Sequence, residues 1–219
     1  MSIYANLTSI QNNIARLYET PVNFSIEDFL ITDLAALGLR QQISSVKTAE
    51  TLYLLETDDG INISLYLDQG IVDSLNESVA SDQWKFTDVK EYLLALEGVS
   101  HFQYLIWNAE RDKSVTLFEL ELQAEVDKYV MASVALADRR EGHIPKDLYG
   151  YLFDSISYRN ELSPEVARRY REANHYAGKY CRSLKSQYPN QHQQIDFLTE
   201  LRQFYRLPCN EKVRRIEHR

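Results

Sequence analysis

The sequence predicts a predominantly helical α+β protein, with a central antiparallel helix pair and a β-hairpin packed on the helical body. Three observations indicate this class. Apolar residues recur at helical spacing over long stretches, one segment alternates around an Asp-Gly pair, and only 7 glycines and 5 prolines interrupt the 219 residues. A chain of this length with 44% hydrophobic residues can bury its core as a single domain without disulfides.

Helical periodicity is present near the start of the chain. Apolar residues recur at spacings of three and four over 3–18, and Pro21 ends that helix. A second helix is predicted from Ser25, a favourable N-cap, to Gly38, a suitable C-cap.

The period then changes from helical to alternating. Residues 51–68 alternate around Asp59 and Gly60, and glycine tolerates the positive φ that tight turns need, so this segment predicts a β-hairpin. An isolated hairpin is only marginally stable, so it must pack on the helices. A short helix and a loop are predicted over 70–86.

The longest helices are predicted in the middle of the chain, over 88–107 and 116–137. Thr116 with Glu119 matches the capping box that opens a helix. The connecting loop is short, so the two helices should be antiparallel neighbours.

Further helices are predicted toward the C-terminus. A short one covers 147–159, and a longer one begins at Ser163-Pro164, an N-cap followed by proline at the first helical position. The last helix covers 190–206, and a basic stub follows.

Charge is distributed unevenly within the single predicted domain. The acidic body, 1–138, has 8 Lys and Arg against 22 Asp and Glu, a balance of −14, whereas 139–219 has 16 against 10, a balance of +6. The basic part is expected to contact the acidic body of its own chain, a second copy, or another acidic partner.

The remaining composition points to a cytoplasmic protein. Cys181 and Cys209 lack the spacing of a disulfide framework or a CxxC motif, which favours reduced thiols. The first residues do not resemble a signal peptide, and no run of about 18 apolar residues predicts a membrane span.

Two polar stripes are the candidate functional residues. Glu97 and His101 lie four apart on the first central helix, and Glu121 and Glu125 lie four apart on the second. Counting outward from the loop places His101 level with residue 122, so the four side chains are predicted to face one another. Three carboxylates and an imidazole suit a divalent metal or a general acid/base pair. The alternative is a structural or solvated stripe, neutralised by Lys90 and Lys128.

Complete catalytic signatures are missing from the sequence. Glu172 and His175 form one ExxH pair, whereas the di-iron helix-bundle scheme needs two, and His175 falls opposite the predicted buried face. The chain has no GxGxxG, Walker A or GxSxG pattern, and no cofactor is predicted beyond a possible divalent metal.

These observations predict an interaction or regulatory protein that acts through a protein partner or as a homo-oligomer. Its 15 tyrosines are compatible with interfaces as well as with helix seams. The alternative function is a metal- or carboxylate-dependent enzyme or a small-ligand-binding protein. Nucleic-acid binding is a further, less favoured option, and it would use the basic residues Arg168, Arg169, Arg171 and Arg182.

Overall fold

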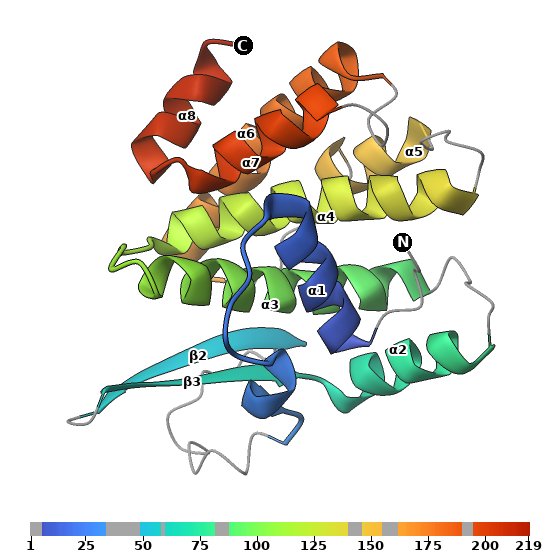
Figure 1. The fold of residues 1–219 in the computed structure, drawn as a ribbon, viewed down its shortest axis with the longest axis vertical. Helices are drawn as coiled ribbons and strands as arrows, with labels where there is room; N and C mark the ends of the chain where they lie inside the picture. The colour runs from blue at the N-terminus through green and yellow to red at the C-terminus, as the bar shows by residue number, and fades with distance from the viewer. Residues whose placement is uncertain are drawn as a thin grey trace.

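The protein is described here by a computed structural model that covers residues 6–33, 49–57, 60–81, 88–139, 146–154, 162–189 and 195–219. Its helices are α1 (Leu7–Tyr18), α2 (Gln69–Ser81), α3 (Asp88–Ala109), α4 (Leu117–Arg139), α5 (Lys146–Tyr149), α6 (Pro164–Gln187), α7 (Ile195–Arg206) and α8 (Cys209–Glu217). Figure 1 shows these elements stacked, with the β-hairpin and α2 at one end, α3 and α4 across the middle, and α6 to α8 at the other end. The predicted α+β class, predominantly helical, is confirmed.

The predicted helix from Ser25 to Gly38 is wrong in the residues that the structure describes. A 3-10 turn, Ile26–Phe29, leads directly into strand β1, Leu30–Ile31, and the Ser25 side chain makes no capping hydrogen bond. β1 lies parallel to β3, with Leu30 opposite Leu65. Pairing with the sheet satisfies the backbone here, and this tertiary contact overrides the local helical pattern. Residues 34–38 lie outside the described residues.

The predicted hairpin is present as strands β2 (Glu50–Thr57) and β3 (Gly60–Leu67). The two strands are antiparallel, and Thr57 lies opposite Gly60 at the turn end. The sheet order is β1-β3-β2, so β2 is an edge strand among the described residues. The sheet packs on α3 through the fully buried side chains of Leu65 and Leu67.

The central pair forms as predicted, and both helices extend two residues beyond their predicted C-terminal ends. The capping box is formed: the Thr116 amide donates to Glu119 Oε2 at 3.0 Å, and the Glu119 amide donates to Thr116 Oγ1 at 3.2 Å. α3 packs on α4 and also on α1, α2 and β2, whereas α4 packs mainly on α3 and α6. The α3–α4 seam is therefore at the centre of the molecule.

The C-terminal part is more helical than the sequence predicted. α6 begins at Pro164, as expected, and its N-cap Ser163 accepts a hydrogen bond from the Val166 amide. The predicted basic stub is instead helix α8, which buries Lys212 and Ile216. One face of α8 packs against the body, and this packing makes a short, highly charged segment helical.

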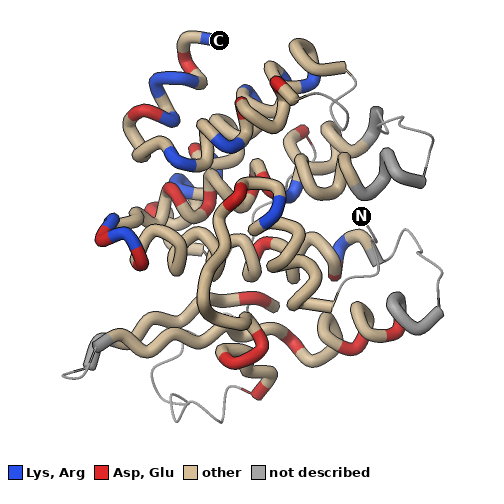
Figure 2. Tube along the Cα trace, viewed as in Figure 1, with Lys and Arg blue, Asp and Glu red and all other residues tan. Residues whose placement is uncertain are grey.

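Lysine and arginine residues are concentrated along α6 to α8 (Figure 2). Part of this charge is directed at the chain's own body: Arg202 Nη1 lies 2.9 Å from Glu19 Oε1, and Arg206 donates to the Tyr18 carbonyl at 2.8 Å. These contacts match the prediction that the basic part packs on the acidic body. No helix in the described part of the chain has the length and apolar character to cross a bilayer.

Candidate functional site

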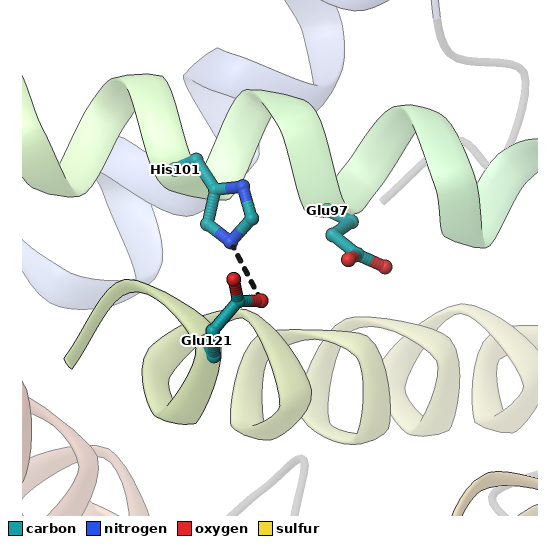
Figure 3. A group of neighbouring side chains, drawn as sticks. All are labelled: Glu97, His101 and Glu121. Carbon is teal, nitrogen blue, oxygen red and sulfur yellow. Dashed lines mark ion pairs between the residues drawn. The ribbon is translucent and has the colours of Figure 1, made fainter. Parts of the chain in front are cut away.

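The α3–α4 seam brings together the four predicted residues, Glu97, His101, Glu121 and Glu125. His101 Nε2 lies 3.6 Å from Glu121 Oε2, and Lys128 lies between Glu97 and Glu125. Figure 3 shows Glu97 and His101 projecting from α3 toward α4, with the His101 ring directed at the Glu121 carboxylate. The i,i+4 spacing on each helix places both pairs on facing stripes, as the sequence count indicated.

His101 is held between two carboxylates from different elements. Its Nδ1 lies 3.5 Å from Oε1 of Glu50, the first residue of β2, and its Nε2 faces Glu121. Burial lowers the pKa of His101, but the two carboxylates outweigh it and hold the pKa well above its ordinary value. A protonated imidazole is therefore favoured when no cation is bound.

Gly98 permits the close approach of Glu50 to this helix. A Cβ at position 98 would lie 2.8 Å from Leu65 Cδ1 and 3.0 Å from Glu50 Cγ, both too short for ordinary contact. A larger residue would force the side chains of Leu65 and Glu50 to shift from their positions against α3. Burial raises the pKa of Glu50, although the neighbouring His101 opposes this shift.

Lys128 bridges the carboxylates at the other end of the cluster. Its ammonium group donates to Glu97 Oε2 at 3.0 Å and to Glu125 Oε1 at 2.7 Å. Burial opposes ionisation of Glu97, but Lys128 and His101 outweigh it, so the pKa of Glu97 is lowered. Burial together with the charges of Glu97 and Glu121 raises the pKa of Glu125 despite Lys128.

Two residues of α6 close the site from the third side. Arg169 Nε lies 3.9 Å from Glu121 Oε1. The Asn174 side-chain amide donates to Glu125 Oε2 at 3.4 Å and to the Leu152 carbonyl at 3.1 Å. Glu50, Glu97, His101, Glu121, Glu125 and Lys128 are called the seam cluster below, and Arg169 and Asn174 flank it.

The seam cluster has more negative than fixed positive charge. Four glutamates face one lysine, with Arg169 beside them, and His101 adds a third positive charge only when protonated. His101 and Glu121 are 7% and 8% exposed, so water screens these charges poorly. With the charges of the described residues alone, the site needs protons or another cation to become charge-balanced.

Three buried polar atoms here have no hydrogen-bond partner among the described residues: His101 Nε2, Glu50 Oε1 and Arg169 Nε. Buried polar atoms in native proteins are nearly always hydrogen-bonded, so unpaired ones concentrated in one place indicate a missing partner. His101 Nε2 points at the Glu121 carboxylate but is slightly too far for a hydrogen bond.

The geometry of three donors fits a cation. One ligand atom each from Glu97, His101 and Glu121 lies within 4.8 Å of the other two. Metal–ligand bonds of roughly 2.0–2.2 Å place the donors of one ion up to about 4.4 Å apart, so a small closure would complete this set. Mixed imidazole and carboxylate ligation suits Zn²⁺, Mn²⁺ or Fe²⁺.

The sequence prediction of facing stripes identified four of these residues and the neutralising role of Lys128. Lys90 is exposed and makes no contact with the seam cluster in the described part of the chain. Glu50, Asn174 and the site role of Arg169 were missed, because no local periodicity connects a strand end or a third helix to this seam. The i,i+4 pairs were found because that signal is local.

Three of the four arginines proposed for nucleic-acid binding lie on one exposed stripe of α6, and Arg169 does not. Arg169 turns toward Glu121, whereas Arg168, Arg171 and Arg182 are exposed on a neighbouring stripe of α6. His175 is exposed on the same helix, as predicted, away from the seam cluster.

Comparisons of the chain with protein-family models, curated proteins and solved structures gave no match. The function is therefore inferred from the geometry of the site.

Proposed function

We propose that the chain is a divalent-cation-binding protein whose ion lies between α3 and α4, with Glu97, His101 and Glu121 as ligands. The observation that carries the proposal is the convergence of these three donors around a buried, unbonded His101 Nε2. Glu50 supports the same arrangement, because its carboxylate lies 3.5 Å from Nδ1 and favours the proton on that nitrogen, which leaves Nε2 free to bind a metal.

The surrounding residues favour metal-assisted acid–base chemistry over simple storage of an ion. A bound cation supplies Lewis-acid character and lowers the pKa of a bound water. Glu125, whose pKa is raised by burial and by its acidic neighbours, is then suited to accept a proton close by. Lys128 and Asn174 hold the two oxygens of Glu125 in place.

Cation binding is tested on full-length protein that has been stripped with a chelator and titrated with Mn²⁺, Zn²⁺, Fe²⁺ and Mg²⁺. Calorimetry gives the stoichiometry, and thermal unfolding gives the stabilisation, which reaches about 2.7 kcal/mol at a hundredfold excess over Kd. His101→Gln and Glu121→Gln keep side-chain size and remove ligand character. Glu172→Gln and His175→Gln, on exposed positions of α6, are the matched controls.

We expect one ion per chain, uptake abolished by the two ligand variants, and uptake unchanged in the two controls. Circular dichroism shows whether the ligand variants remain folded. If the wild type takes up none of the four ions, the seam cluster is an ion-pair network. Equal losses in ligand and control variants would also reject the site.

A second proposal, association through the hairpin, is favoured by the exposed apolar end of the sheet. Leu54, Leu55 and Ile61 are 47%, 53% and 63% exposed, and β2 pairs only with β3 among the described residues. The hairpin also projects beyond the helical body (Figure 1). Exposed edge strands with apolar side chains pair readily with another chain. In this proposal a protein partner, or a second copy of the chain, binds by pairing its backbone with the exposed edge of β2.

Association is measured by size-exclusion chromatography with light scattering over a range of concentrations. The double variant L54K/I61K places charge on one face of the hairpin, and L117K, at an exposed position 56% accessible, is the control. Concentration-dependent assembly lost only in the hairpin variant supports the proposal. A monomer at every concentration, with no co-purifying protein, argues against it.

A further inference from the structure

A cavity of about 290 Å³ lies between α6 and the segment that follows α5. One side is formed by Arg171, His175, Lys179 and Arg182, and the other by the rings of Tyr149 and Phe153. The four basic positions are spaced by three or four residues, so they follow one stripe of α6. A cavity of this size accommodates a small molecule rather than a folded partner.

Three positive charges that line this cavity form no ion pair in the part of the chain that the structure describes. Among the described residues, no acidic oxygen lies within 4.0 Å of Arg171, Lys179 or Arg182, although Asp154 also lines the cavity. Elsewhere in the described chain, arginines are commonly paired, as Arg202 is with Glu19 and Arg215 with Glu200. In a protein with a net charge of −8, three cations that line one cavity beside a single described carboxylate favour an anionic ligand.

The aromatic side of the cavity is fixed in position. The Tyr149 hydroxyl donates to the Gly178 carbonyl at 3.0 Å, and its ring lies 5.0 Å from that of Phe153. The Arg182 guanidinium lies 5.2 Å from the centre of the Tyr149 ring. A planar or apolar group can pack against these rings while its charged end meets the basic stripe.

We infer that this cavity binds a small organic phosphate, with the phosphate on Arg171, Lys179 and Arg182 and the organic part against Tyr149 and Phe153. Two guanidinium groups match the geometry of a phosphate better than ammonium groups alone, because each donates two parallel hydrogen bonds. The site is separate from the seam cluster, and Asn174 lies in the wall between them.

A long nucleic acid fits this surface less well. The basic residues line a cavity of about 290 Å³, which is small for a long polymer, and the acidic remainder of the chain repels a polyanion. Arg168 lies on the same stripe of α6 but outside the cavity. A polyanion that follows the stripe would contact Arg168, whereas a small ligand in the cavity would not.

The test uses full-length, chelator-treated protein, so that its outcome does not depend on cation binding. Phenyl phosphate, inorganic phosphate, phenol and a single-stranded oligo(dT) are titrated at moderate salt by calorimetry. Arg171→Gln and Arg182→Gln remove cavity charges, whereas Arg168→Gln removes a neighbouring charge on the same helix. All three positions are exposed, so these variants are expected to fold.

Phenyl phosphate should bind more tightly than inorganic phosphate, and phenol should not bind measurably. Each cavity variant should weaken phenyl phosphate at least about ten-fold, and Arg168→Gln by less than about two-fold. Binding of phenol equal to that of phenyl phosphate would overturn the inference, as would no binding of any probe. Tighter binding of oligo(dT) that depends equally on Arg168 would assign the surface to nucleic acid instead.

Discussion

Two buried polar clusters lie on opposite faces of α4, and they differ in how well their polar atoms are paired. Glu121 and Glu125 face the seam cluster, whereas Gln123 and Asp127 face α1, α8 and the side of α3 that carries Ser100. Residues two apart on a helix are about 200° apart around its axis, so a single helix separates the two clusters.

The second cluster is closely hydrogen-bonded. Tyr18, Ser100 and Gln123 each donate to the Asp127 carboxylate, and Lys212 Nζ donates to Gln123 Oε1 at 2.6 Å. These five residues, called the core network, are all 0% or 1% exposed. They join α1, α3, α4 and α8, which are distant in sequence.

The seam cluster has a different character. It has surplus negative charge, unbonded atoms on His101 and Glu50, and a side-chain exposure of 12% to 19% at Lys128, Glu125 and Glu97. A paired network in a dry interior fixes one arrangement, whereas an unpaired one with limited access to solvent is suited to a ligand. Burial alone therefore does not distinguish structural from functional polar residues. If the proposed cation site is correct, the pairing of their atoms separates the two clusters.

The largest effect should follow from breaking the core network at its centre. Asp127→Ala leaves three buried donors without an acceptor, and we expect a loss of about 3–5 kcal/mol in the free energy of unfolding. Urea denaturation measures this loss. The exposed Glu172→Ala should change stability by less than about 0.5 kcal/mol. A cost near that of the control would mean that Asp127 does not organise the core.

The second largest expected effect is a dependence of the free energy of unfolding on pH, caused by Lys212. Burial lowers the pKa of Lys212 to about 7, although Glu119 and Asp127 act in the opposite direction. The unfolded chain keeps this proton up to a pH of about 10.5, so between these values the unfolded state binds more protons and stability rises with pH.

Denaturation of the wild type and of Lys212→Met at pH 7, 8 and 9 isolates this contribution. The wild type should gain up to about 1.4 kcal/mol per pH unit relative to the variant. Parallel pH profiles for the two proteins would show that the ammonium group is not buried in solution.

Local patterns were sufficient for much of the fold. The hairpin, the capping box at Thr116 and the start of α6 at Ser163 each depend on residues within a few positions of one another. The segment after Ser25 was mispredicted because its state depends on pairing with β3, far along the chain. Helix α8 was not predicted, because it is rich in charged residues and its buried residues are only Lys212 and Ile216.

The residues of the seam cluster were likewise predictable only where the signal is local in the sequence. Facing stripes on two adjacent helices were predictable because the short loop fixes the register. The approach of Glu50 depends on a sheet packing against Gly98, and no sequence spacing encodes that contact.

The contact between Gly98 and Glu50 gives a third, smaller prediction. In Gly98→Ala the added methyl meets Leu65 Cδ1 at 2.8 Å, and we expect a loss of about 1–2 kcal/mol together with weaker cation uptake. Gly178→Ala is the matched control, because its added methyl finds ordinary 3.4 Å contacts and alanine favours a helix. Unchanged cation uptake in Gly98→Ala would show that Glu50 does not position His101.

The smallest expected change in stability is the most diagnostic. Glu125→Gln removes a buried charge whose ionisation is already disfavoured, while the glutamine oxygen can still accept from Lys128. Without a cation, we expect its stability to be unchanged or higher by up to about 1 kcal/mol, whereas stabilisation by added cation should fall. Chemical denaturation with and without the bound ion measures both quantities. A loss of several kcal/mol in the cation-free protein, comparable to that of Asp127→Ala, would place Glu125 in a structural network and remove the distinction between the two faces of α4.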